Sequence, residues 1–165
     1  MSSTDSENTT FETFPKPTHD HSRCVRDALA NGLAICKARG VRFTELRKQV
    51  FELVCASHKP IGAYDILDTF QKRGRKTAPP TVYRALEFLL EQGLIHRIAS
   101  LNAYIGCDFP QEPHRGQFVV CKLCGEATEL VSHTIEKCIT AAAEKLDFQV
   151  QSRVIEILGI CSVCR

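Results

Sequence analysis

Two Cys-x-x-Cys pairs in the C-terminal third of the chain are the residues best suited to chemistry: Cys121 with Cys124, and Cys161 with Cys164. Four thiolates in two close pairs are the ligand set of a closed tetrahedral zinc site. The two residues inside each pair let one turn direct both sulfurs at the same metal, and Gly125 eases the backbone around the first turn. The pattern predicts one structural zinc ion held by both pairs.

The same cysteines have two other interpretations, a redox motif and a set of disulfides. A redox Cys-x-x-Cys normally occurs once, beside a βαβ pattern, and neither alternative requires both pairs. The 36 residues between the pairs exceed the usual zinc-ribbon spacer. A shared metal would therefore fasten residues 161–164 to a much earlier turn.

The composition of the chain indicates the cellular compartment in which the protein is expected. Residues 1–21 are polar and acidic without the apolar stretch of an export signal, and no run approaches the roughly 18 apolar residues of a membrane span. Nine cysteines in an unexported chain are expected to be reduced thiols and metal ligands. We therefore expect a cytoplasmic protein.

The net charge of +2 conceals an uneven distribution. Residues 22–106 hold 14 Lys and Arg against 7 Asp and Glu, whereas residues 107–165 hold 6 against 8 and residues 1–21 hold 1 against 4. A basic N-terminal half is typical of a segment that meets a polyanion such as DNA. An excess of this size is also common on ordinary solvated surfaces, so charge alone does not decide the matter.

The basic half has the apolar periodicity of four helices, expected over residues 22–39, 45–57, 63–73 and 80–92. Thr44 is placed to cap the second helix, and Pro80 suits the first turn of the fourth. The side chains expected to face the core are Val25, Leu29, Leu33, Ile35, Leu46, Val50, Leu53, Val54, Ile66, Leu67, Phe70, Val82, Leu86, Leu89 and Leu90.

After Gly93 the periodicity changes to that of short strands. Residues 94–99 and 103–107 are separated by a turn at 100–102 and predict a hairpin. Helices followed by a hairpin are typical of a winged helix-turn-helix domain, whose second helix enters the DNA major groove. The DNA-contacting residues would be Thr81, Tyr83 and Arg84. A small helical bundle with these residues on its surface is the alternative, and periodicity alone does not separate the two.

The C-terminal half is predicted to be a β-β-α-β unit. Strands are expected at 117–121, 127–131 and 148–161, with an amphipathic helix over 132–146. So small a unit is expected to need zinc and a second subunit for stability. The predicted α+β chain thus divides into a disordered tail, a winged-helix DNA-binding domain, a linker and a zinc-binding dimerisation domain, at residues 1–21, 22–106, 107–115 and 116–165.

Several stretches resemble the Fur family of metal-responsive repressors, and within it the zinc-sensing branch. They are TVYRALEFLLEQGLIHRI, YIGC, PHRGQFVVCKLCG and CSVC, in family order over residues 22–164. The resemblance implies a homodimer with a winged helix, a dimerisation domain and a structural zinc ion. It also implies closure onto palindromic operator DNA when a second, exchangeable metal binds. Tyr64 matches a family position and is expected to pack on a base or phosphate.

The resemblance also implies the ligands of the second metal. The iron-sensing branch has a His-rich stretch before the first cysteine pair, and this chain keeps only His114 there. The zinc-sensing branch matches His96, Cys107, His114 and Glu129. One thiolate, two imidazoles and one carboxylate suit zinc and disfavour harder ions. These ligands would come from wing, linker and dimerisation domain, so two zinc ions per chain are expected, one of them joining the two domains.

Each of these four residues also has a plain structural interpretation. His96 fits a polar strand position, Cys107 a small buried hydrophobe, His114 a linker residue and Glu129 a surface charge. Nearby substitutes as ligands are Asp108 and His133.

Other polar and thiol groups are weaker candidates. The loose cluster of His19, Asp20, His21 and Cys24 is interpreted as a tail beside a helix start, with a metal site as the alternative. Three further cysteines, Cys36, Cys55 and Cys138, fall in helical patterns and are expected to be buried or half-buried.

No catalytic triad, phosphate loop or paired-carboxylate motif is found, so we do not expect an enzyme. Three functions remain open. They are a zinc-responsive repressor of zinc-uptake genes, a sensor of the same fold for iron, manganese, nickel or peroxide, and a zinc-dependent thiol oxidoreductase. A soft thiolate ligand at Cys107 argues against the second, and metal-locked thiolates argue against the third.

Overall fold

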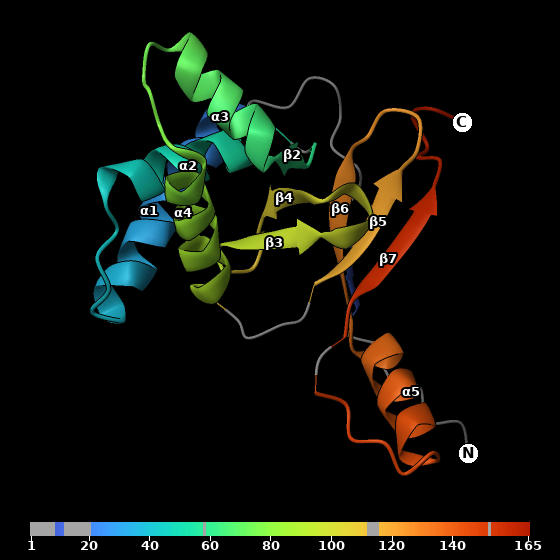
Figure 1. Cartoon of the computed structure of the whole chain (residues 1–165). Coiled ribbons are helices and arrows are strands. Elements are labelled where there is room, and N and C mark those ends of the chain that lie inside the picture. The colour runs from blue at the N-terminus through green and yellow to red at the C-terminus, as the bar shows by residue number, and fades with distance from the viewer. Residues whose placement is uncertain (1–8, 12–20, 58, 112–115, 152) are drawn as a thin grey trace.

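The computed structural model describes residues 9–11, 21–57, 59–111, 116–151 and 153–165, and Figure 1 shows their arrangement. Four helices and a three-stranded sheet form a helical part, and a four-stranded sheet with one projecting helix forms a C-terminal part. The predicted α+β class, a winged helix-turn-helix followed by a small α/β unit, is confirmed. None of the helices in the described residues is long and apolar enough to cross a membrane.

The helical part follows the predicted pattern closely. Its elements are α1 (His21–Ala38), α2 (Glu45–Cys55), β2 (Ile61–Gly62), α3 (Ala63–Lys72), α4 (Pro79–Glu91), β3 (Ile95–Ile98) and β4 (Ala103–Gly106). The Thr44 side chain caps α2 by accepting a hydrogen bond of 3.4 Å from the Arg47 N–H. Gly93 ends α4 with a φ of +65°, a left-handed conformation that glycine adopts without strain.

The predicted hairpin is the wing, which we define as residues 95–106. Its strands β3 and β4 pair antiparallel, and the short β2 adds to β4 to give the sheet order β2-β4-β3. A 3-10 turn over Ala99–Leu101 joins β3 to β4 and ends at Asn102, whose φ is +48°. Arg97 donates a hydrogen bond of 2.8 Å to the Asn102 side chain and so closes the turn.

Helices α2, α3 and α4 enclose the main core. Its fully buried members include Val50, Val54, Ile66, Val82, Leu86 and Leu89. The prediction of Leu33 as a core residue is wrong, because its side chain is 50% exposed and α1 instead turns Gly32, Ile35 and Cys36 inward. A Cβ atom on Gly32 would lie 3.1 Å from the Phe51 ring, so the missing side chain lets α1 approach α2 along this face.

The C-terminal part is built on a sheet of order β1-β6-β5-β7. Its elements are β1 (Thr9–Phe11), β5 (Gln117–Cys121), β6 (Ala127–Ser132), α5 (His133–Glu144) and β7 (Ile155–Gly159). Strand β7 runs parallel to β5, and the other neighbours are antiparallel. The segment assigned to a disordered tail thus contributes a three-residue strand.

Two predicted elements in this part are shorter than expected. The helix expected over 132–146 ends at Glu144, and Leu146 is 80% exposed. The strand expected over 148–161 covers only Ile155–Gly159, because only these residues pair with β5. The turn between them includes Asp147 at a φ of +52°, which an apolar pattern does not signal.

The wing packs against the C-terminal sheet. Ile98 and Ile105 of the wing form one apolar cluster with Phe118, Val120 and Ala127 of the sheet. Helix α5 projects away from this contact, and none of its described side chains is buried. The sheet therefore offers one face to the wing, while no part of the described chain buries a side chain of α5.

The core assignment predicts different effects on stability for the truncation of Leu86, on α4, and of Leu33, on α1. Leu86→Ala is expected to lower the free energy of unfolding by about 2–5 kcal/mol, because the side chain is fully buried and truncation leaves a cavity. Leu33→Ala is the matched control, expected to change it by less than about 0.5 kcal/mol. Urea denaturation of both variants measures the difference, and equal losses would contradict the assignment.

Candidate functional site

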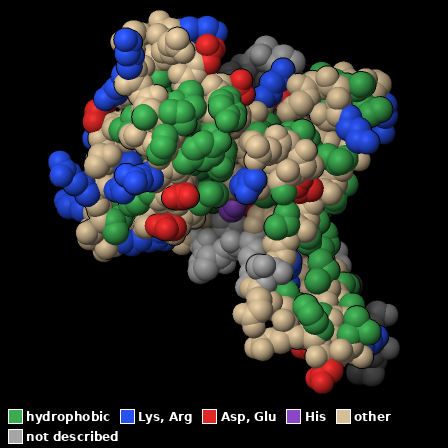
Figure 2. All heavy atoms as spheres, in the orientation of Figure 1, with side chains coloured by type: hydrophobic (Ala, Val, Ile, Leu, Met, Phe, Trp, Pro, Cys, Tyr) green, Lys and Arg blue, Asp and Glu red, His purple; other side chains and the backbone are tan. Residues whose placement is uncertain are grey.

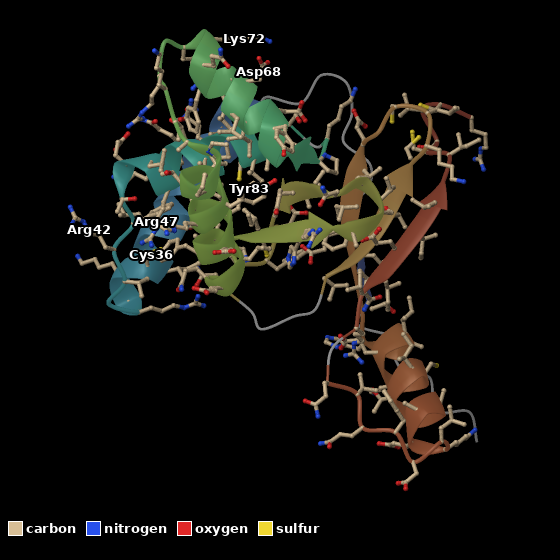
Figure 3. All side chains as sticks on the ribbon, in the orientation of Figure 1. Cys36, Arg42, Arg47, Asp68, Lys72 and Tyr83 are labelled. Carbon is tan, nitrogen blue, oxygen red and sulfur yellow. The ribbon has the colours of Figure 1, made fainter. Side chains whose placement is uncertain are left out.

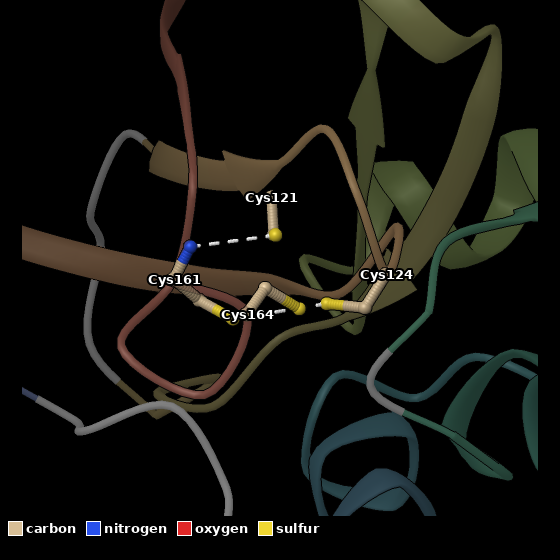
Figure 4. Close-up of side chains that lie close together, drawn as sticks. All are labelled: Cys121, Cys124, Cys161 and Cys164. Atoms are coloured by element: carbon tan, nitrogen blue, oxygen red, sulfur yellow. Dashed lines mark hydrogen bonds between the residues drawn. The ribbon is translucent and has the colours of Figure 1, made fainter.

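The two cysteine pairs meet at one end of the C-terminal sheet (Figure 4). Parallel pairing brings this about: Cys121 is the last residue of β5, and Cys161 follows the neighbouring strand β7. The Lys122 N–H donates a hydrogen bond of 2.8 Å to the Gly159 carbonyl and extends the contact past the strand ends. We call Cys121, Cys124, Cys161 and Cys164 the cysteine cluster.

The geometry of the cysteine cluster fits zinc. Its four sulfur atoms all lie within 4.8 Å of one another, and the Sγ atoms of Cys124 and Cys161 are 3.9 Å apart. Zn–S bonds of about 2.3 Å in a tetrahedron place the sulfurs ~3.8 Å apart. All nine cysteines of the chain are free thiols, so none of these sulfurs is used in a disulfide.

The thiols of this cluster differ in acidity. Hydrogen bonds from the backbone N–H groups of Cys124 and Cys161 lower the pKa of Cys121 to about 6. Hydrogen bonding with Cys161, together with burial, raises the pKa of Cys164 to about 12. Four close thiolates repel one another, so a cation is needed to hold them all in the ionised form. A divalent metal supplies that charge, and its binding releases protons.

A second group of ligand-type side chains lies between the two parts of the chain. His96 lies on β3, Cys107 directly follows β4, and Glu129 lies on β6. One ligand atom from each lies within 4.8 Å of the others. The Nε2 atom of His96 is 3.2 Å from Oε1 of Glu129, and the Asp108 N–H donates to Oε2 of Glu129 at 3.4 Å. We call these three residues the interdomain cluster.

Neighbouring residues fix the orientation of these side chains. The Phe118 ring lies against the His96 ring, with centroids 5.2 Å apart. A Cβ atom on Gly116 would lie 2.4 Å from the Phe118 ring and 3.1 Å from Nδ1 of His96, so only glycine fits there. The Cys107 N–H donates a hydrogen bond of 3.0 Å to the Leu94 carbonyl. Sequence reasoning missed Gly116 and Phe118, because their roles depend on contacts across the two parts.

The protonation of Cys107 is relevant to metal binding. Burial raises the pKa of this thiol, and the nearby Glu129 carboxylate raises it further. The thiol therefore holds its proton at neutral pH and releases it when a cation binds. An imidazole, a thiolate and a carboxylate at this spacing suit zinc.

Other predicted ligands take different positions. His114 lies outside the described residues, as do His19 and Asp20. Asp108 offers its backbone N–H to Glu129, and His133 lies on α5, 3.5 Å from Glu136, so neither joins the three clustered side chains.

The remaining cysteines only partly match the expectation of burial. Cys36 is buried and Cys55 is half-buried, as expected. The expectation for Cys138 is wrong, because this residue lies on the uncovered face of α5 and is exposed.

The predicted DNA-contacting residues lie on exposed helix surfaces. Thr81, Tyr83 and Arg84 are exposed in the first two turns of α4, while Val82 between them is fully buried. Tyr64, in the first turn of α3, is 75% exposed. Figure 2 shows Lys and Arg side chains over this part of the molecule. Helix α4 therefore presents a polar face to solvent from a rigid apolar support.

Part of the positive charge in the helical part is engaged within the chain. The Arg47 guanidinium lies 3.5 Å from the centroid of the Phe88 ring, and Lys72 forms a 2.6 Å ion pair with Asp68. Figure 3 labels Arg47 with the neighbouring Arg42, and Lys72 with its partner Asp68. The net charge of this segment thus overstates the number of side chains available to a polyanion.

A winged helix joined to a second part of the chain through metal-ligand side chains has the architecture of a metal-responsive regulator. A model of the ferric uptake regulator family matches residues 38–158, and the chain belongs to this family. Membership in a family of regulators also confirms the prediction that the chain is not an enzyme.

Individual relatives agree with this assignment. The zinc uptake regulation protein of Escherichia coli is 38% identical over 141 residues, which cover 85% of this chain and 82% of that protein. A zinc uptake regulator in complex with zinc and DNA is 37% identical, with a TM-score of 0.80 over 85% of this chain and 94% of that one. The resemblance to the zinc-sensing branch is confirmed.

A third relative has been solved in two forms. Holo XcZur is 36% identical and gives a TM-score of 0.75 over 88% of this chain and 98% of its own. Apo XcZur covers 85% of this chain and 97% of its own, at 34% identity, but gives a TM-score of only 0.51. This chain as a whole thus superposes better on the holo form than on the apo form.

The geometry of the interdomain cluster predicts a selective effect of Cys107→Ser. This variant is expected to keep its fold and one tightly held zinc ion but to lose the zinc ion that a mild chelator removes. Metal content per chain, measured before and after chelation, tests this.

Zinc affinity at this site is also expected to rise between about pH 6 and 8, because binding displaces the thiol proton.

Two further substitutions serve as controls. Cys138→Ser, at an exposed thiol on α5, is expected to retain both ions. Cys161→Ser is expected to lose the tightly held ion and the folded C-terminal part, since structural zinc contributes directly to folding. A Cys107→Ser protein that keeps both ions after purification would place the exchangeable site elsewhere.

Proposed function

We propose that this protein is a zinc-responsive transcriptional repressor that binds palindromic operator DNA as a zinc-loaded homodimer and represses zinc-uptake genes. The interdomain cluster is the observation that carries the proposal. Its side chains come from the wing, from Cys107 directly after the wing and from the C-terminal sheet, and they lie close enough to share one ion. The similarity to zinc uptake regulators, one of them in complex with zinc and DNA, supports the same function.

We assign two zinc ions to each chain. The cysteine cluster would hold a structural ion, because all four ligands belong to one part of the chain. His96, Cys107 and Glu129 would hold the regulatory ion with His114 as a fourth ligand. Zinc, when bound there, supplies positive charge and a fixed ligand geometry. His96 and Cys107 then hold the base of the wing to Glu129, and binding favours the arrangement in which the two parts are joined.

A homodimer follows from the apolar surface of the C-terminal part. Strand β7 is at an edge of the sheet, and α5 buries none of its described side chains. A two-fold axis that pairs two copies would cover both features. The exposed large apolar side chains in this region include Leu146, Phe148, Val154, Ile157, Leu158 and Ile160.

The proposed dimer places two α4 helices at a fixed separation. Thr81, Tyr83 and Arg84 would enter the major groove, and Tyr64 would pack on a neighbouring base or phosphate. The domains proposed for this mechanism are those expected from the sequence, with the winged helix over 22–106, a linker over 107–115 and the dimerisation domain over 116–165. Basic residues of the first domain add a salt-sensitive share of the affinity.

The alternative functions are less well supported. A sensor of iron, manganese or peroxide is disfavoured by the thiol ligand of the interdomain cluster, which suits a softer ion. A thiol oxidoreductase needs an accessible reactive pair, whereas Cys121 and Cys161 are 1% and 4% exposed.

Substitution of Arg84 tests base recognition. Arg84→Ala is expected to reduce the preference for operator over random DNA by roughly 1–3 kcal/mol, the value of a good bidentate contact to guanine. Lys122→Ala removes an exposed positive charge in the C-terminal part and is the control. Equilibrium binding to both DNAs measures the effect. An equal loss of affinity for both DNAs would instead make Arg84 a phosphate contact.

The proposed function as a whole is tested with altered operators. Half-sites are expected ~10 bp apart, or a multiple of that, because both recognition helices meet the same face of the duplex. Insertion of 5 bp between half-sites should therefore abolish zinc-dependent binding, and insertion of 10 bp is the control for length. The proposal fails if affinity survives the 5 bp insertion or rises when the exchangeable zinc is removed.

A further inference from the structure

Three side chains form a row across the face of the C-terminal sheet that meets the wing. Phe118 of β5 is paired with Glu129 of β6 on one side and with Glu156 of β7 on the other. Directly paired residues of neighbouring strands point to the same face of a sheet. Phe118 packs with Ile98 and Ile105 of the wing, so both carboxylates lie on the wing side of the sheet.

The two carboxylates contact the wing at two separate places. Glu129 is 3.2 Å from His96, near the base of the wing. Glu156 accepts hydrogen bonds from the backbone N–H groups of Ala99 at 2.5 Å and Ser100 at 3.0 Å, in the turn between β3 and β4. The fully buried Ile98 lies between these two contacts in the chain.

The spacing of the contacts follows from strand geometry. Ala99 is three positions after His96, which corresponds to ~10 Å along an extended strand. Two strand spacings separate Glu129 from Glu156, which again corresponds to ~10 Å. A wing strand that crosses the sheet therefore meets both carboxylates at once, and Figure 1 shows β3 directed toward β5 and β7.

The second contact is complete without a metal ion. Glu156 accepts from two N–H groups at the start of a 3-10 turn, where backbone donors need a partner outside the turn. Burial raises the pKa of Glu156, but hydrogen bonds from Ser100 and Ala99 lower it by more, so its net pKa is below the ordinary value. The carboxylate is therefore ionised at neutral pH, and neither hydrogen bond involves a metal-ligand side chain.

We propose that Glu156 is a positioning residue that docks the tip of the wing on the C-terminal sheet independently of zinc and thereby sets the zinc concentration at which the protein binds DNA. This inference rests on the proposed function. With Glu156 in place, the metal-free chain already spends part of its time with the wing docked, and less binding energy is needed to complete closure. Without it, only zinc binding and the apolar contacts of Ile98 and Ile105 hold the wing.

Hydrogen exchange at two backbone amides tests the docking itself. The Ala99 and Ser100 amides are followed in full-length protein, with and without the exchangeable zinc, in the absence of DNA. Both amides are expected to be protected in both states, and Glu156→Ala should speed their exchange by roughly tenfold, as hydrogen bonds to a charged acceptor imply. Glu156→Gln keeps an acceptor oxygen and is expected to be intermediate. Glu144→Ala, at an exposed carboxylate on α5, is the control.

Zinc titrations of operator binding test the regulatory consequence. Glu156→Ala is expected to raise the free zinc concentration for half-maximal binding about tenfold, with two zinc ions per chain retained. The proposal is overturned if the two amides of the stripped parent protein exchange as fast as those of Glu156→Ala, or if the variant responds to zinc like the parent. If no protein binds operator in a zinc-dependent way, the proposed function fails, and amide protection still decides whether Glu156 docks the wing.

Discussion

A carboxylate buried between two parts of the chain is the constraint on which the arrangement depends. Glu129 is 2% exposed, and removing an ionised group from water costs several kcal/mol unless partners compensate. His96 and the Asp108 N–H are partners, while the raised pKa of Cys107 keeps that thiol neutral. A divalent cation at this point would neutralise the carboxylate and take up the thiolate. Metal binding would then be coupled to the docking of the base of the wing against Glu129.

The positions of their ligands give the two clusters different roles. The four sulfurs of the cysteine cluster come from the end of β5 and from the turns after β5 and β7, so an ion there fastens one part of the chain to itself. The interdomain cluster takes ligands from β3, from the residue directly after β4 and from β6, so an ion there depends on how the two parts are placed. The same metal would therefore serve folding at one site and regulation at the other, without any difference in its intrinsic chemistry.

Local signals in the sequence predicted much of this structure. The two Cys-x-x-Cys pairs are together sufficient to suggest a shared metal, and Thr44 and Gly93 mark helix ends by their own chemistry. Features that depend on contacts between distant parts of the chain could not be predicted from local sequence signals. Leu33 fits a core pattern, yet its helix turns Gly32 toward Phe51 instead, because glycine permits a close approach.

The candidate sites also combine residues that the sequence could identify with residues that only the three-dimensional structure could. His96, Cys107 and Glu129 are far apart in the sequence, and only the family resemblance brought them together before the structure did. Glu156 gave no signal at all, because its role depends on the register of β7 beside β5 and on the docking of the wing. The sheet that positions both carboxylates is formed by strands that no local pattern places side by side.

The central claim is that a metal at the interdomain cluster fixes the separation of the two recognition helices in a homodimer. A spin label introduced as a noncanonical amino acid at the exposed Glu91, at the end of α4, allows that separation to be measured while all native cysteines are kept. The account predicts one narrow distance distribution for the zinc-loaded dimer and a broader one after the exchangeable zinc is removed. An equally narrow distribution at the same distance in both states would contradict it.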